Sequence, residues 1–186
     1  QELSPDDVRE LVTLRLGGEV PPEILSVIQE RAGGNPLFAE EYAETLCETG
    51  RLQAVGDRWV LAGSVSDALK LPDTLQGVVL ARLERLEESI KRTAQVASVV
   101  GEDLRLSVLE HVHPEQVPLE ELVNQLRELA RRGLVVEEQA GPPPAYRFRH
   151  SVVQEMAYRT LLHAERRAMH GAVVGWYERL SGLEED

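Results

Sequence analysis

The sequence contains a single cysteine, Cys47, among its 186 residues. One cysteine cannot form an internal disulfide, and such sparse use of cysteine fits a reducing compartment, so we expect a cytoplasmic protein. No apolar run approaches the roughly 18 residues that a membrane helix needs, and no secretory signal opens the chain. The chain begins at Gln1 rather than Met, which favours a fragment of a longer protein.

The usual catalytic motifs are also missing. The sequence has no Gly-x4-Gly-Lys-Ser/Thr phosphate loop, no Gly-x-Ser-x-Gly elbow, no His-Glu-x-x-His zinc helix and no Cys-x-x-Cys pair. His111 and His113 lie two apart at a helix end, which favours surface or loop histidines over a metal site. Cys47 is expected to be a small buried or half-buried residue rather than a nucleophile. We therefore predict no enzyme activity for this chain by itself.

Charge is abundant but unevenly distributed. The chain has 32 acidic and 20 basic residues, a net charge of −12. Residues 1–50 carry eleven acids and three bases, a net of −8, whereas residues 139–170 carry five arginines and two acids, a net of +3. The basic stretch is either a set of solvated helix faces or a local surface that faces an anion. Acid pairs such as Glu40-Glu41, Glu87-Glu88 and Glu120-Glu121 are interpreted as solvated helix faces.

The first 70 residues predict three helices and a hairpin. Ser4 has an acidic residue three positions later, as in a capping box, and glycine or proline signals separate three apolar stripes at helical spacing. Gly56-Asp57 is a two-residue loop suited to a primed turn between two short strands, which predicts a hairpin within residues 51–61. Residues 64–70 are interpreted as a loose connector that closes at Leu71-Pro72.

From Pro72 onward the apolar spacing is again helical and then changes to that of strands. The predicted helices lie near residues 75–86, 90–100, 104–112 and 119–132. A hairpin follows, with strands at 134–136 and 146–149 joined by a loop at 141–144, and two more helices cover 151–162 and 164–180. Three helices followed by a hairpin is the order of elements in a winged helix. The fold class we predict is therefore mostly α: a helical bundle with a small β-hairpin, then a winged-helix domain, then C-terminal helices.

Four short stretches of the sequence together resemble a known family. Residues 33–41, Gly-Gly-Asn-Pro-Leu-Phe-Ala-Glu-Glu, are similar to the Gly-x-Pro motif of the STAND nucleotide-switch ATPases, which are relatives of AAA+ proteins. The similarity is greatest to versions in bacterial LuxR-type transcription regulators and in ATPase modules associated with adenylate cyclases. Residues 71–83, 94–101 and 146–158 resemble the winged-helix domain of the same family. The resemblance covers nearly the whole chain, and its strength lies in the order and spacing of motifs that are individually short.

The resemblance implies a part of a signal-transduction switch. Residues 1–70 would be the AAA+-like helical lid, residues 72–162 the winged helix with its following helix, and residues 163–186 a helical extension. An upstream P-loop ATPase domain of the same parent chain would be the partner, with ATP or ADP clamped between the parts and a homo-oligomer formed on activation. The isolated fragment, which lacks the phosphate loop, is expected to bind no cofactor by itself.

Residue roles follow from the resemblance one at a time. Pro36 matches the motif proline that packs on the adenine base, with Asn35 beside it; the alternative is a plain proline at the start of a helix. His150 matches the winged-helix histidine that contacts the β-phosphate of ADP, with Arg149 beside it; the alternative is a capping or packing histidine. At position 151 many family members carry Asp, whereas this chain has Ser151, which can still cap a helix.

Two other classes of function remain open at this stage. A winged helix suggests a DNA-binding transcription regulator, but the expected recognition helix at 119–132 begins with Glu120 and Glu121 and is balanced rather than basic, which argues against nucleic acid. The other is a helical adaptor whose acidic N-terminal part recruits a basic partner.

Overall fold

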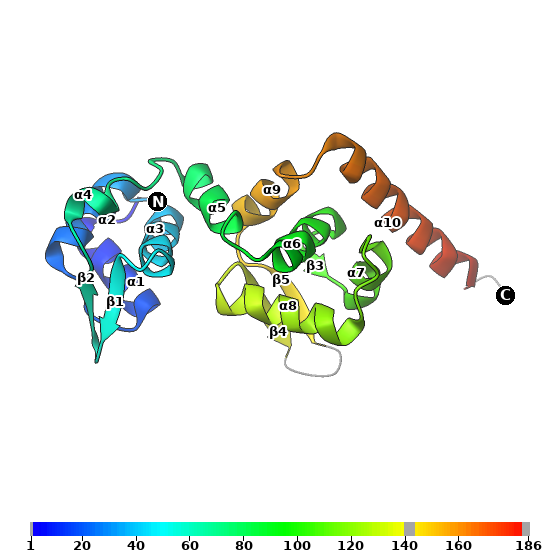
Figure 1. Ribbon diagram of the computed structural model, residues 1–186, viewed down its shortest axis with the longest axis horizontal. Coiled ribbons are helices and arrows are strands. Elements are labelled where there is room, and N and C mark those ends of the chain that lie inside the picture. Colours follow the sequence, from blue (N-terminus) through cyan, green and yellow to red (C-terminus); the bar gives the residue numbers. More distant parts are fainter. Residues whose placement is uncertain (1, 140–143, 184–186) are drawn as a thin grey trace. The chain divides into compact units, whose positions relative to one another are not determined.

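The computed structural model describes residues 2–139 and 144–183 and divides into two compact units between Arg82 and Leu83 (Figure 1). The fold is mostly α, with two small antiparallel hairpins and helices at the C-terminal end, so the predicted fold class is confirmed. The loop predicted at 141–144 lies, except for its last residue, outside the described residues. Over the part of the chain that is described, no helix has both the length and the apolar character needed to cross a membrane.

The first unit is a bundle of helices with one hairpin. Its elements are α1 (Pro5–Leu16), α2 (Pro22–Ala32), α3 (Pro36–Glu48), β1 (Leu52–Val55), β2 (Arg58–Leu61), α4 (Val65–Ala68) and α5 (Leu75–Leu83).

Local signals in the sequence account for the ends of these elements. The Ser4 hydroxyl accepts a hydrogen bond from the Asp7 amide at 3.2 Å, and the Asp7 carboxylate accepts one from the Ser4 amide at 3.0 Å. This reciprocal pair is the expected capping box, and the hydrogen bonds from Ser4 lower the pKa of Asp7. Gly56 has a φ of 62°, as the first central position of a primed hairpin turn requires, so the hairpin prediction is confirmed. Within the predicted connector, by contrast, residues 65–68 form the single-turn helix α4.

Helix α3 lies at the centre of the first unit, because α1 and α2 both pack against it. The side chains of Ala39, Tyr42, Ala43 and Leu46 are completely inaccessible to solvent. A helix that is covered on more than one side cannot present a simple polar face to water. This central position explains the burial of charged groups on α3 that is described below.

The boundary of the first unit lies further along the chain than the sequence analysis placed it. The predicted connector near Leu71 assigned the following helix to the winged-helix part. In the structure Leu71 and Val78 belong to the apolar core of the first unit, and Leu75 packs against that core. Helix α5 is therefore attached to the first unit, which extends to Arg82.

The second unit combines helices with a small three-stranded sheet. Its elements are α6 (Glu88–Val100), β3 (Asp103–Leu104), α7 (Leu106–Val112), α8 (Leu119–Arg131), β4 (Val135–Gln139), β5 (Ala145–Phe148), α9 (Ser151–Arg159) and α10 (His163–Leu183).

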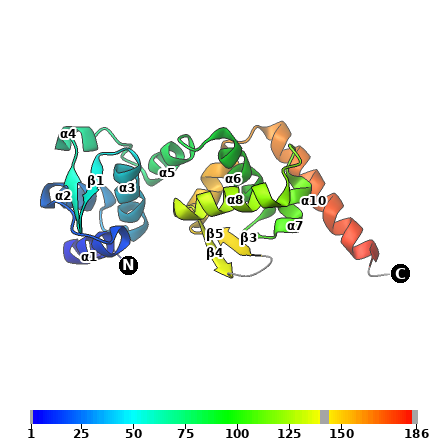
Figure 2. The same cartoon turned by 60° about the horizontal axis from the view of Figure 1, so that its bottom comes forward.

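The three strands pair in the order β3-β5-β4, and both pairings are antiparallel. Three helices precede the β4–β5 hairpin, in the order that the sequence analysis predicted, and Figure 2 shows β5 beside β4 below α8. The prediction of one helix over residues 104–112 is wrong at its start. Leu104 pairs with Tyr146 in the sheet, and the helix begins at Leu106. A two-residue strand has no periodicity of its own, so only its pairing reveals it.

Helix α6 is the centre of the second unit, with α8 and α9 packed against it. Leu122, Leu126 and Leu129 of α8 and Val96 and Ala97 of α6 are completely buried. Helix α10 packs against α7 and α6. Leu122, Leu126 and Leu129 follow the i, i+4, i+7 spacing that the sequence indicated for α8.

Candidate functional site

The Gly-Gly-Asn-Pro segment forms the turn between α2 and α3. Gly33 and Gly34 have φ values of 53° and 78°, which reverse the chain after α2. The Asn35 side chain then accepts a hydrogen bond from the Phe38 amide at 3.2 Å, and Pro36 is the first residue of α3. Both side chains are exposed, so they could contact a further group.

Gly34 has a packing role in addition to its turn conformation. The Leu3 amide donates to the Gly34 carbonyl at 2.8 Å. A Cβ at Gly34 would lie 2.9 Å from the Leu3 carbonyl oxygen, closer than real Cβ contacts allow. The segment before α1 therefore fixes this turn through a backbone contact that only glycine permits at position 34.

The start of α9 is held at the edge of the sheet. The Arg149 amide donates to the Leu134 carbonyl at 3.1 Å, directly after β5 ends at Phe148. His150 has an extended backbone, with φ −139° and ψ 141°, and is the N-cap residue of α9. Its carbonyl accepts a hydrogen bond from the Val153 amide at 3.0 Å, while its half-buried side chain makes no capping bond. The sequence placed His150 correctly between a strand and a helix.

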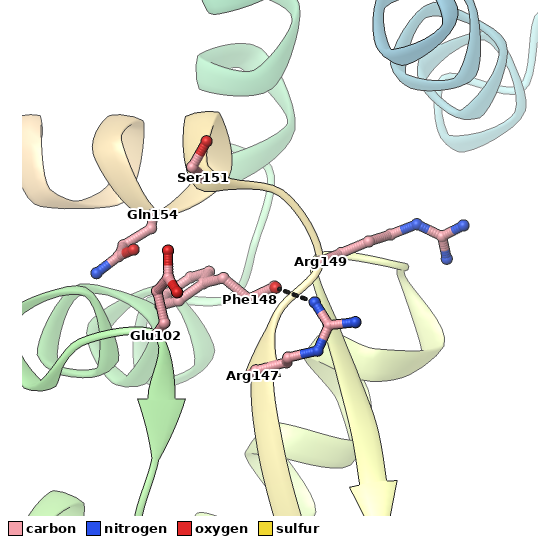
Figure 3. A pocket seen from close by; sticks show the side chains of 6 residues that line it. All are labelled: Glu102, Arg147, Phe148, Arg149, Ser151 and Gln154. Atoms are coloured by element: carbon pink, nitrogen blue, oxygen red, sulfur yellow. Dashed lines mark hydrogen bonds between the residues drawn. The ribbon is translucent and has the colours of Figure 1, made fainter.

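A small hollow of about 110 Å³ lies beside this helix start, lined by Glu102, Arg147, Phe148, Arg149, Ser151 and Gln154. Figure 3 shows the two arginines extending on one side of Phe148 and the two other long polar side chains on the opposite side. The Gln154 amide group donates to the Ser98 carbonyl at 3.2 Å, which ties α9 to α6. The hollow thus gathers residues of β5, of the first turns of the nine-residue helix α9 and of the segment before β3, while the end of the Arg149 side chain extends away from Glu102 and Gln154 (Figure 3).

The basic stretch around this site is partly neutralised. Arg147 forms an ion pair with Glu138 across the hairpin, and Arg159 pairs with Glu155 at 2.6 Å. The Arg166 guanidinium lies 4.6 Å from the centre of a tyrosine ring. These contacts are typical of ordinary helix and strand surfaces. Within residues 139–170, the candidate anion-facing surface is therefore the end of β5 and the start of α9.

The predicted site residues form two groups. Asn35 and Pro36 adjoin one another in the first unit, and Arg149 and His150 adjoin one another in the second. Each pair lies at the start of a helix, where free amide groups favour an acceptor or an anion.

Glu41 is not the solvated residue that the acid-pair interpretation predicted. Its side chain is buried on α3, where its carboxylate pairs with the guanidinium of Arg82 from α5. The same guanidinium donates to Glu48 from Nη2 at 2.8 Å and from Nε at 3.1 Å. Burial by itself lowers the pKa of Arg82, but the two carboxylates raise it by more, so the arginine stays charged. The partners lie 34 and 41 residues apart along the chain, so no local sequence signal could reveal the cluster.

The other two acid pairs are exposed as predicted, since the side chains of Glu87, Glu88, Glu120 and Glu121 all face solvent. These four residues lie at the starts of α6 and α8, whereas Glu41 lies in the middle of α3. Position along the helix distinguishes the exposed pairs from Glu41.

His113 is a buried histidine rather than a surface one. Its Nδ1 accepts a hydrogen bond from the Glu115 amide at 3.3 Å, and its Nε2 lies 3.4 Å from the Thr93 hydroxyl. That hydroxyl donates to the side-chain carbonyl of Gln125, so it accepts from the histidine. This fixes the neutral Nε2–H tautomer. Burial is the main cause that lowers the pKa of His113. Among residues 2–139 and 144–183 no group of three His, Cys, Asp or Glu side chains could hold a metal ion.

Two comparisons with known proteins give a match. Residues 4–57 match the model of a family described as a domain of unknown function, DUF8739, which covers α1 to the turn of the first hairpin. Over 157 residues the chain is 24% identical to Uncharacterized protein R02095 of Rhizobium meliloti (strain 1021). The match covers 80% of this chain and 14% of that protein. Because neither description carries an activity, a functional proposal must rest on the site itself.

Proposed function

We propose that this chain is the regulatory part of a nucleotide-dependent signalling ATPase of the STAND class, a helical lid followed by a winged helix. It would close on ADP or ATP held by an upstream P-loop domain of the same cytoplasmic parent protein and would control assembly into a homo-oligomer. The chain would contribute contacts to the nucleotide and no catalytic group. The observation that carries this proposal is the hollow at the start of α9, with Arg147 and Arg149 beside it.

The size of the hollow supports a shared site. A water molecule takes up about 30 Å³ in the liquid, and pockets for drug-sized ligands measure about 300–1,000 Å³. A hollow of about 110 Å³ is therefore too small for a nucleotide and suits a phosphate-sized group. A partner domain would have to hold the remainder of the ligand.

The chemistry of the helix start supports an anion there. Helix α9 presents its first-turn amides beside Arg149 and the exposed Ser151. A guanidinium group suits phosphate oxygens because it offers several donors in one plane. Glu102 adds one negative charge to the lining, against the two positive charges of Arg147 and Arg149.

Titration calorimetry with ADP on a longer protein that contains this chain and its upstream P-loop domain tests the proposal. We expect His150→Ala to weaken ADP binding about 10- to 100-fold, the loss of one hydrogen bond to a charged group. His163→Ala, at the exposed start of α10, is the matched control and should change the affinity less than twofold. Unchanged affinity in His150→Ala, or micromolar ADP binding with phosphate release by residues 1–186 alone, would contradict the proposal.

A DNA-binding regulator is the alternative, favoured by the winged-helix order of strands. Against it, α8 begins with two exposed glutamates, and its last turn carries Arg131, which pairs with Glu128. A basic footprint is what DNA phosphates require. Saturable binding of duplex DNA at low salt, measured by gel shift, would support the alternative. Together with absent ADP binding by the longer protein, it would overturn the adenine-nucleotide proposal.

A further inference from the structure

Helix α5 is attached to the first unit by a few side chains. Leu75 and Val78, with Leu71 just before the helix, pack on the apolar core of that unit. Arg82, in the last turn, extends to α3, and its side chain is only 1% exposed. The long side chain of an arginine can bridge a separation that backbone packing leaves open. The ion-pair cluster is thus the specific, directional part of the attachment.

The guanidinium of Arg82 bridges two turns of α3. Glu41 and Glu48 are seven residues apart, about 10 Å along a helix axis, and project from the same face. Nη1 donates to Glu41, while Nε and Nη2 both donate to Glu48. One planar group can satisfy both carboxylates only when α5 lies at one position along α3.

A third glutamate lies between them on the same stripe. Glu44 pairs with Arg15 of α1 at 2.9 Å, so the acidic stripe of α3 (Glu41, Glu44 and Glu48) meets one arginine from α1 and one from α5. Burial raises the pKa of Glu44, while the two arginines lower it. Because Arg15 is already paired with Glu44, these ion pairs contain no second arginine that could replace Arg82 if α5 moved away.

Buried ion pairs of this kind determine geometry more than they add stability. Removing both charges often leaves a protein as stable as before, whereas removing one strands the other in a low-dielectric interior. A small shift of α5 would leave the buried Glu41 without its hydrogen bond. Intermediate positions are therefore unfavourable, and the attachment is either complete or lost.

We propose that Arg82 is a latch: it fixes α5 on α3 in a single register, and its release lets α5 detach as a local unit while the rest of the first unit stays folded. The chain leaves the first unit directly after Arg82, so the latch controls the helix through which any conformational signal must pass along the chain. The proposal does not depend on nucleotide binding.

Native-state hydrogen exchange on the whole chain tests the latch. In Arg82→Met, which keeps the length and apolar stem of the side chain, we expect the amides of residues 78–83 to exchange at least tenfold faster. The amides of α1, α2 and α3 should change less than twofold. Arg9→Met is the matched control, because it removes an exposed arginine from a surface ion pair with Asp6, and α5 exchange should then stay unchanged.

A second variant separates the latch from the penalty of a stranded charge. In Arg82→Met/Glu41→Gln the urea midpoint should recover toward that of the unaltered chain, while residues 78–83 continue to exchange at least tenfold faster. Recovery of α5 protection in this variant would overturn the latch, as would an equal acceleration over α1, α2 and α3 in Arg82→Met.

Arg82→Lys provides the test should the methionine variants fail to fold. Lysine keeps the charge but cannot donate to both carboxylates with a planar fork. We expect α5 exchange to rise several-fold without a change in α1 to α3. Unchanged exchange in this variant would show that bridging two turns of α3 is not what holds α5.

Discussion

Replacing Thr93 with valine tests the buried polar chain that joins α6 to α8 in the second unit. The Thr93 hydroxyl donates to Gln125 and accepts from His113, and all three residues are at most 6% exposed. Valine has nearly the same shape but no hydroxyl. The substitution therefore removes two hydrogen bonds and leaves a buried acceptor and a buried donor without their partner.

The size of the effect follows from the number of stranded groups. A buried donor or acceptor that loses its partner costs about 1–3 kcal/mol. With two such groups, and some relief because Gln125 still donates to Glu121 at 3.2 Å, we expect a loss of about 2–4 kcal/mol in the free energy of unfolding. For a unit of roughly 100 residues, each kcal/mol lowers Tm by about 4–8 °C, so Tm should fall by roughly 10–25 °C.

Urea and thermal unfolding, followed by circular dichroism, measure this loss. Thr13→Val, at a half-buried position of α1, is the matched control and should stay within about 0.5 kcal/mol of the unaltered chain. In Thr93→Val/Gln125→Leu the stranded acceptor is gone, so part of the stability should return, giving a coupling energy of about 1 kcal/mol or more. A change below about 0.5 kcal/mol in Thr93→Val, or strict additivity in the double variant, would refute the reasoning.

Three further predictions concern single groups. Burial lowers the pKa of His113, so the unfolded chain binds its proton more readily; stability should be full above about pH 6.5 and fall as the pH drops below it. Urea midpoints from pH 8 to 5 should show this loss, and an equal loss in His113→Gln would contradict it. Gly34→Ala should destabilise the chain by about 2 kcal/mol or more, and Gly33→Ala by about 1 kcal/mol, because only a Cβ at position 34 meets the Leu3 backbone. Equal shifts in Tm on thermal unfolding of the two variants would exclude that contact. Burial, and to a smaller extent the charges of neighbouring glutamates, raise the pKa of Cys47 to about 12. Iodoacetamide at pH 8 should therefore alkylate the native chain at least ~100-fold more slowly than the urea-unfolded chain. Comparable rates would rule out a protected thiol.

Most elements of the fold could be predicted from the sequence because their signals are local. The capping box at Ser4, the turn at Gly56 and the leucine stripe of α8 each act within a few residues, and the structure has the corresponding ends and faces. The strand at Leu104 could not be predicted in this way. It exists only because Tyr146, more than forty residues later, supplies its partner.

The candidate site was predicted in part. The turn that contains Asn35 and Pro36 and the helix start at His150 follow from glycine, proline and the change of period. The hollow was not predicted, because Glu102 and Gln154 come to the end of β5 only through the packing of the sheet on α9.

By itself, the sequence determined most of the places where helices and hairpins begin and end, though not the single-turn helix α4 or the strand at Leu104. Only the tertiary structure decided which charged and polar groups lie inside. Glutamate and histidine are residue types that usually lie at the surface, yet Glu41 and His113 are buried. Arg82 supplies the hydrogen bond for Glu41 and Thr93 the one for His113, and both partners are distant in sequence. A buried polar group is stable only with its partner, and the partner is a property of the fold rather than of the local sequence.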